Sequence, residues 1–232
     1  KLMENCYRDV RFAFANQIAM LAEKIGINIH KAIEAVNLNY QRNSIPKPSP
    51  GVGGPCLTKD PYILNKVFER NGMKADLLLA ARSINESIVE AIPLRCDNML
   101  KIAGKTLINA NVFIIGFAFK GEPETSDHRD STSLWFLDSL KKYTKNIKGY
   151  DPVVPSDHIA ALGVKIADVE DGFKDADAVF IMNNHRSYLR WNIDKLISKM
   201  NKPALFFDSW HVFSKRNMSQ YKDIIYSSVG LG

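Results

Sequence analysis

The segment ANVFIIGFAF, residues 110–119, decides the fold of this chain. It is apolar almost throughout and rich in branched and aromatic side chains, which is typical of a strand buried on both faces of a sheet. Further strands are predicted at 146–152, 177–185, 203–210 and 223–230. Helices are predicted between them at 131–143, 155–163 and 186–200. Strands that alternate with helices through short connections predict an α/β fold, a doubly wound, Rossmann-like parallel sheet over residues 106–232.

Upstream of this segment the periodicity is helical. Apolar residues recur at helical spacing over residues 1–25. Further helices are predicted at 28–39, 60–70 and 76–103. Asp60 followed by Pro61 is typical of a capped helix start, and Pro93 is expected to kink or divide the last helix. We therefore expect an all-helical domain at 1–105 and an α/β domain at 106–232.

Composition excludes several classes of function. The chain has 232 residues and a formal net charge of +6, and no apolar run approaches the ~20 residues that a membrane helix needs. The basic run LKKYTKNIK, residues 140–148, is interpreted as a solvated helix end rather than a nucleic-acid patch. The chain has an odd number of cysteines, and no pair among Cys6, Cys56 and Cys96 has CxxC spacing. We therefore expect no disulfide framework and no metal site, and we expect a cytoplasmic location. A mildly basic balance suits an anionic small substrate.

The segment GVGGPCLTKDP, residues 51–61, carries the strongest chemical signal. Its glycines let the backbone approach a ligand closely. Cys56 precedes the predicted start of a helix, where the helix dipole favours a thiolate, and Lys59 acts in the same direction. From these residues alone two interpretations remain open, a covalent nucleophile or a small buried hydrophobic residue.

Three ordered motifs give the chain a specific resemblance. GVGGPCLTKDP followed by Tyr62 resembles the catalytic-cysteine motif of the UDP-glucose/GDP-mannose 6-dehydrogenase family, in the form found in UDP-N-acetylmannosamine dehydrogenases. KLMENCYRDVRFAFANQIA, residues 1–19, resembles the central helix of that family. VFIIGFAFKGEPETSDHRDSTSLWFLDSL, residues 112–140, resembles the start of its C-terminal nucleotide-sugar domain.

The resemblance implies a reaction and its catalytic residues. Members of the family oxidise the C6 alcohol of a nucleotide sugar to a carboxylate, with two NAD and no metal, through a thiohemiacetal and a thioester on the cysteine. Cys56 would be this nucleophile. Lys1 and Asn5, four residues apart and so on one helix face, would stabilise the developing oxyanion, and Asp60 would activate or orient the hydrolytic water. Without the resemblance, Lys1 and Asn5 would be an ordinary exposed pair and Asp60 a helix cap.

The resemblance also implies residues that bind substrate and cofactor. The predicted substrate-binding residues are Arg42, Lys47, Gly53, Gly54, Phe119 and Lys120. Arg42 would reach the site of a neighbouring subunit, because the helical region of the family forms a homodimer. Arg129 matches an arginine that approaches NAD. Taken singly, Lys120, Arg129 and Arg42 would each be interpreted as a solvated surface charge.

Several features depart from the family pattern. No GxGxxG follows a predicted strand, so we expect a C-terminal portion whose NAD is bound mainly by an N-terminal domain absent from this chain, and which is inactive alone. His128 replaces a threonine, and Ser209-Trp210-His211 replaces an arginine-containing segment. The alternatives left open are a UDP-sugar-binding and dimerisation module, a member specific for UDP-glucose or GDP-mannose, and an unrelated thiol enzyme with a histidine base near Cys56.

Overall fold

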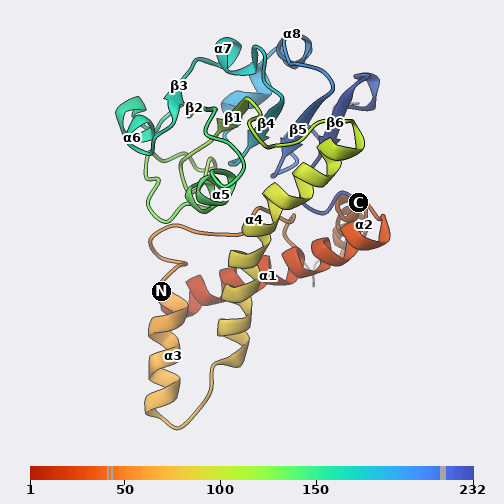
Figure 1. The fold of residues 1–232 in the computed structure, drawn as a ribbon. Coiled ribbons are helices and arrows are strands. Elements are labelled where there is room, and N and C mark those ends of the chain that lie inside the picture. Colours follow the sequence, from red (N-terminus) through yellow and green to blue (C-terminus); the bar gives the residue numbers. More distant parts are fainter. Residues whose placement is uncertain (41, 43, 215–217) are drawn as a thin grey trace. The chain divides into compact units, whose positions relative to one another are not determined.

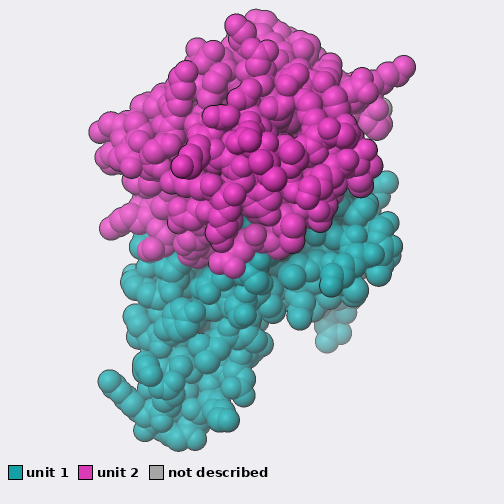
Figure 2. Space-filling model, viewed as in Figure 1, with its two compact units in different colours: residues 1–89, 229–232 teal, residues 90–228 magenta. Residues whose placement is uncertain are grey.

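The computed structural model describes residues 1–40, 42, 44–214 and 218–232. These residues form two compact units (Figure 2). Unit 1 comprises residues 1–89 and 229–232, and unit 2 comprises residues 90–228. The division falls after Val89, inside one long helix, α4 (Asp76–Ile102), whereas the sequence predicts a domain boundary near residue 105.

Unit 2 is built on one parallel sheet (Figure 1). Its strands are β1 (Val112–Ile115), β2 (Ile147–Tyr150), β3 (Lys165–Ile166), β4 (Ala178–Ile181), β5 (Ala204–Asp208) and β6 (Ile224–Ser227). Their order is β3-β2-β1-β4-β5-β6, and every neighbouring pair runs parallel. This order reverses direction between β1 and β4, as in a doubly wound Rossmann-type sheet, so the predicted fold class is confirmed.

Helices cover both faces of this sheet. They are α5 (Thr132–Leu140), α6 (Ser156–Ala161), α7 (Val169–Phe173), η1 (Arg186–Arg190), α8 (Ile193–Ser198) and η2 (Met218–Gln220). Phe113, Val179 and Phe206 belong to a buried cluster with residues of α7 and α8. Alternate strand residues point to the opposite face. There the Phe180 ring lies 4.7 Å from that of Phe136 on α5.

Local chemistry explains where unit 2 differs from the predicted elements. The strand predicted at 110–119 ends at Ile115, because Gly116 adopts a φ of 93° and a Cβ there would lie 2.6 Å from the Asn183 side chain. The helix predicted at 186–200 is split into η1 and α8, because Asn192 caps a new helix by accepting a hydrogen bond from Lys195 N. Strand β3 and helix α7 were not predicted.

Unit 1 is helical apart from its loops. It contains α1 (Leu2–Ile25), α2 (Ile29–Asn37), α3 (Asp60–Arg70) and the first half of α4. Proline 93 lies inside α4, which continues through it. Because a proline has no N–H, Pro93 cannot donate to the carbonyl of Val89, and Val89 is also the residue at which the two units divide. No helix in the described residues combines the length and the apolar character that a membrane span needs.

Candidate functional site

The Cys56 loop is a tight turn leading into α3. Gly54 adopts a φ of 87°, and its carbonyl accepts hydrogen bonds from Thr58 N at 3.3 Å and Thr58 Oγ1 at 2.9 Å. The carbonyl of Cys56 accepts a bond from Asp60 N at 2.9 Å. The Cys56 thiol is free and half-buried, in contrast to the buried thiols of Cys6 and Cys96. The backbone therefore presents Cys56 one helical turn before Asp60.

Asp60 is a buried carboxylate with two side-chain partners. Asn5 Nδ2 donates to Asp60 Oδ2 at 2.6 Å, and Lys59 Nζ donates to Asp60 Oδ1 at 2.9 Å. The hydrogen bonds from Lys59 and Asn5 hold the pKa of Asp60 below its ordinary value, against the opposing effect of burial. The prediction that Asp60 caps α3 is wrong, because Lys59 is the cap residue and the carboxylate of Asp60 turns to Asn5 instead.

Helix α1 brings a second predicted residue to the same group. Asn5 N donates to Lys1 O at 3.0 Å, so Lys1 and Asn5 are one helical turn apart. The exposed Lys1 side chain adds a smaller electrostatic contribution that also lowers the pKa of Asp60. Asn5 and Lys59 thus share the carboxylate of Asp60, and Lys1 lies one turn before Asn5. Together with the turn that carries Cys56, these residues are called the Cys56 constellation.

Sequence reasoning missed a buried arginine behind this constellation. The Arg82 side chain is 1% exposed, and its Nη1 donates to Asp9 Oδ1 at 2.9 Å. The guanidinium also donates to the carbonyls of Val52, at 3.1 and 3.2 Å, and Leu57, at 3.1 Å. Burial outweighs the attraction of Arg82 and raises the pKa of Asp9 to about 6. The available signal was a lone arginine inside an apolar helical stretch, together with Asp9 one turn after Asn5.

The network continues along the loop through buried amides. Asn85 Nδ2 donates to Asp9 Oδ1 at 2.8 Å, and Asn16 Nδ2 donates to Asn85 Oδ1 at 2.8 Å. Asn16 Oδ1 in turn accepts from Ser49 N at 2.9 Å. Gly51 passes so close to α4 that a Cβ would lie 2.1 Å from the Asn85 carbonyl oxygen. The whole glycine loop is therefore held against α1 and α4.

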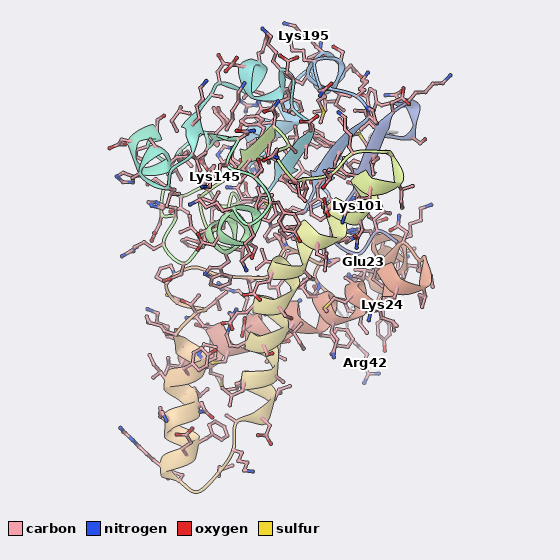
Figure 3. All side chains as sticks on the ribbon, in the orientation of Figure 1. Glu23, Lys24, Arg42, Lys101, Lys145 and Lys195 are labelled. Carbon is pink, nitrogen blue, oxygen red and sulfur yellow. The ribbon has the colours of Figure 1, made fainter. Side chains whose placement is uncertain are left out.

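The other predicted residues of unit 1 lie apart from these contacts. Gly53 and Gly54 are buried in the loop itself. Lys47 is exposed and pairs with Glu34 at 3.7 Å. Arg42 is exposed, and its side chain extends outward from unit 1 (Figure 3). Within the part of the chain that the structure describes, no hydrogen bond or ion pair joins Lys47 or Arg42 to Cys56 or Asp60, so their substrate contacts stay predictions.

The predicted residues of unit 2 follow strand β1. The Lys120 amine lies 5.4 Å from the centre of the Phe119 ring, and both side chains are half-buried. Gly121 N donates to Asn184 Oδ1 at 3.1 Å, which attaches this loop to the end of β4. Arg129 is bound at both ends of its fork by Asp127, at 2.9 and 2.7 Å, and is largely exposed. Its predicted approach to NAD also stays a prediction.

The turn after β1 does not form a dinucleotide cradle. Phe117 N and Ala118 N both donate to Asp151 Oδ2, at 2.7 and 3.0 Å. Asn183 fills the space beside Gly116, and its Nδ2 lies 3.3 Å from the same carboxylate oxygen. A Rossmann sheet that binds pyrophosphate leaves these N–H groups open. The described residues of unit 2 therefore do not fit a dinucleotide at this turn.

Within the described residues, no three His, Cys, Asp or Glu side chains group as metal ligands. The half-buried Trp210, just after β5, donates from its indole Nε1 to Met182 O at 3.0 Å.

Two family models match the chain. The model described as the UDP-glucose/GDP-mannose dehydrogenase family, central domain, matches residues 1–87. The model described as the UDP binding domain of the same family matches residues 113–215. The two matches cover the Cys56 constellation and the loop that carries Phe119 and Lys120.

Known proteins agree with these models. A UDP-N-acetyl-D-mannosamine dehydrogenase of Pyrococcus horikoshii is 33% identical over 217 residues, which are 93% of this chain and 48% of the relative. A solved UDP-D-ManNAc dehydrogenase structure from the same organism aligns with all of this chain and 51% of its own, at 31% identity and a TM-score of 0.83. An NDP-N-acetyl-D-galactosaminuronic acid dehydrogenase structure from Methanosarcina mazei aligns with 99% of this chain and 50% of its own, at 27% identity and a TM-score of 0.83. The chain spans about half the length of the curated relatives it matches.

Proposed function

Because the chain belongs to the UDP-glucose/GDP-mannose dehydrogenase family, we propose that it forms the part of a nucleotide-sugar 6-dehydrogenase that carries the catalytic cysteine and the UDP-binding domain. The proposed substrate is UDP-N-acetylmannosamine, and the proposed product is the corresponding C6 carboxylate. The substrate proposal is supported by the names of several relatives. The observation that carries the mechanism is the buried 2.6 Å hydrogen bond between Asn5 and Asp60, one turn from the free thiol of Cys56.

Each residue of the constellation has one role in the proposal. The sulfur of Cys56 bonds to C6 of the sugar aldehyde, the carbonyl π bond breaks, and the oxygen takes a proton, which gives a thiohemiacetal. The amide of Asn5 and the amine of Lys1 stabilise negative charge on that oxygen. In the later hydrolysis of a thioester, Asp60 orients water and accepts its proton, the water oxygen bonds to C6, and the bond from C6 to sulfur breaks. An aspartate is ionised at neutral pH, as this role requires, and the hydrogen bonds from Lys59 and Asn5 lower the pKa of Asp60 further and hold its oxygens in place.

The proposed hydride acceptor is NAD. When bound, NAD supplies the oxidising equivalents for both steps at C6. Since Asp151 occupies the N–H groups of the turn after β1, we place most of the NAD site outside the residues of this chain. In unit 2, Lys120 and the loop around it are proposed to contact the diphosphate or the sugar, because a lysine amine suits phosphate oxygens.

A decisive experiment uses the natural polypeptide that contains this chain. NADH formation and carboxylate production are measured with UDP-N-acetylmannosamine, UDP-glucose and GDP-mannose. We expect the first substrate to give the highest kcat/KM, and higher values with either of the others assign the protein to the alternative specificity. Cys56→Ser should produce at most aldehyde, whereas the buried control Cys96→Ser should retain both oxidations. Wild-type carboxylate production by Cys56→Ser would reject the covalent mechanism.

A second candidate function is a UDP-sugar-binding and dimerisation module without turnover. It is favoured by the absence of a dinucleotide cradle at the turn after β1 in the described residues. The same experiment separates the two functions. Binding of UDP by calorimetry without NADH formation, by the complete polypeptide and with all three substrates, would support the module.

We also propose a homodimer through unit 1. Large apolar side chains are exposed along α1, among them Met3, Tyr7, Phe14, Leu21 and Ile25. A self-complementary two-fold interface would remove such a surface from water. Phe14→Glu should convert the dimer to a monomer in sedimentation experiments. An unchanged mass for this variant, or a wild-type monomer at micromolar concentration, would reject the proposed interface.

A further inference from the structure

We propose that Arg82 is a positioning residue, which fixes the Cys56 loop to α1 so that the thiol captures the aldehyde before it is released. This inference rests on the proposed function. It concerns an arginine that lies inside the protein and that contacts the backbone of the loop rather than the thiol itself. Its role is therefore to hold geometry, not to react.

The hydrogen bonds of Arg82 lie on both sides of Cys56. The carbonyl of Val52 is four residues before the cysteine, and the carbonyl of Leu57 is one residue after it. A planar guanidinium donates in several fixed directions at once, so Arg82 Nη1 and Nη2 hold the two flanks at a set separation. A lysine ammonium at the same position would have to satisfy the same acceptors from a single nitrogen.

Asp9 connects Arg82, and through it the loop, to helix α1, which carries the proposed oxyanion donors Lys1 and Asn5. Asp9 is one turn after Asn5 on α1, and its Oδ1 accepts from both Arg82 and Asn85. Helix α1 is therefore linked to the cysteine segment in two ways. Asn5 bonds Asp60 directly, and Asp9 bonds Arg82, whose guanidinium in turn bonds the carbonyls of the loop. Two attachments one turn apart fix the orientation of the segment relative to α1, which a single hydrogen bond would leave free to rotate.

Energetics favour a geometric role for this pair. The Arg82 and Asp9 side chains are both 1% exposed. Taking two charges out of water costs about as much free energy as their attraction returns, and apolar replacements of such pairs are often as stable. Stability alone therefore does not explain a buried ion pair here. Placement does, because a misplacement of about 1 Å at a reacting atom is enough to slow a step roughly a hundredfold.

The test separates positioning from folding by the products formed. The first oxidation breaks a C–H bond of the alcohol and does not require the thiol, whereas carboxylate formation requires capture by Cys56. The complete polypeptide is assayed with UDP-N-acetylmannosamine, and the released aldehyde is trapped with 2,4-dinitrophenylhydrazine after the reaction has been quenched with acid. The variants are Arg82→Lys and Asp9→Asn. Asp9→Asn is the milder change of the two, because the asparagine keeps an acceptor oxygen for Arg82. The matched control is Asp97→Asn, which loses a buried carboxylate of unit 2 that accepts from Thr106 and Leu107 N.

We expect Arg82→Lys to lower kcat for the carboxylate at least tenfold and to change total alcohol oxidation less than threefold, so that the ratio of trapped aldehyde to carboxylate rises above that of the wild type. Asp9→Asn should shift the same ratio in the same direction by a smaller factor, and Asp97→Asn should leave the ratio unchanged. An equal fall of both products, an unchanged ratio, or failure of both variants to fold by circular dichroism would overturn the positioning role. Cys56→Ser in the same assay tests the proposed function separately, because wild-type carboxylate production by this variant would reject that function. If Cys56→Ser releases aldehyde and Arg82→Lys leaves the ratio of aldehyde to carboxylate unchanged, only the positioning role of Arg82 is rejected.

Discussion

The two units fill their interiors with different chemistry. The centre of unit 1 holds charged and amide side chains, including Asp9, Asn16, Asp60, Arg82 and Asn85, all buried. The centre of unit 2 is an apolar cluster of strand and helix residues. The surfaces show the opposite distribution: within the described residues, most of the large apolar side chains that are exposed belong to unit 1.

This difference separates two tasks. Burial of apolar side chains contributes stability in proportion to area and does not depend on direction. Hydrogen bonds and ion pairs are directional, so a buried polar network fixes positions at little net gain in stability. The large apolar cluster of unit 2 therefore contributes mainly stability, whereas the buried charged and amide network around Arg82 in unit 1 holds a loop in one conformation. The predictions below test this contrast.

The largest expected effect is on catalysis in unit 1. Asp60→Asn removes the charge that accepts from Lys59 and Asn5. Loss of a general base typically slows a reaction about 10²- to 10⁴-fold, so carboxylate formation by the complete polypeptide should fall into that range while thermal unfolding changes little. Rapid-quench product analysis and calorimetry measure the two quantities. A wild-type rate would remove Asp60 from the mechanism.

In unit 2 we expect an effect of similar size, but on the free energy of unfolding rather than on the rate of the reaction. Phe180 is fully buried, with its ring 4.7 Å from Phe136 and 5.9 Å from Phe207. Phe180→Ala should lower the free energy of unfolding by about 3–5 kcal/mol, the usual result of removing a buried aromatic ring. Denaturant titration measures the loss, and hydrogen exchange should locate it in the strands of unit 2. A loss below about 1 kcal/mol would contradict the tightly packed core.

A smaller effect is expected from pH. Burial raises the pKa of Asp208, at the end of β5, to about 6. The folded protein therefore binds a proton more tightly than the unfolded chain, so stability is highest below about pH 4 for this group and is lost as the pH rises to about 6. The loss amounts to at most about 3 kcal/mol.

Asp208→Asn should remove this dependence between about pH 4 and 6, as measured by urea unfolding at several pH values. Asn keeps an acceptor oxygen for Phe213 N, whose bond to Asp208 Oδ2 is 2.8 Å. An identical pH dependence in the variant and the wild type would show that Asp208 titrates normally in the folded state.

The smallest effect is expected at the surface of unit 2. Glu170 accepts from Lys195 at 2.7 Å and from Lys199 at 2.5 Å, and these bonds lower its pKa to about 2. All three side chains are partly or largely exposed, so water and salt screen the pairs. Glu170→Gln should leave the melting temperature within experimental scatter. A drop of several degrees would mean that this surface network contributes more than the contrast between units allows.

The sequence predicted elements well wherever a local pattern exists. Both the helix predicted from residue 28 and the helix predicted from residue 131 begin at a polar cap: the side chain of Asn28 accepts from His30 N at 3.0 Å, and that of Ser131 accepts from Ser133 N. Strand β3 was missed because it is two residues long and both are exposed, which leaves no apolar pattern. The split of η1 from α8 depends on the cap formed by Asn192, a polar residue that periodicity alone does not distinguish.

The candidate site was predictable where motifs carry it and not where tertiary contacts do. Cys56, Asn5 and Asp60 were singled out from spacing and resemblance, and the structure brings Asn5 and Asp60 together. Arg82 was missed because its partner Asp9 is 73 residues away, and no local pattern announces such a pair. Asp60 was expected to cap a helix because Pro61 follows it. That expectation failed because Asp60 instead bonds Asn5, which is 55 residues away in the sequence and which no local pattern indicates.

The central claim, a covalent intermediate at Cys56, is tested most directly by mass spectrometry of the Asp60→Asn polypeptide quenched during turnover with UDP-N-acetylmannosamine and NAD. Slow hydrolysis should let the sugar nucleotide accumulate as a thioester, and the peptide containing Cys56 should carry its added mass while the peptides of Cys6 and Cys96 do not. An unmodified Cys56 peptide throughout a reaction that still produces carboxylate would contradict the account.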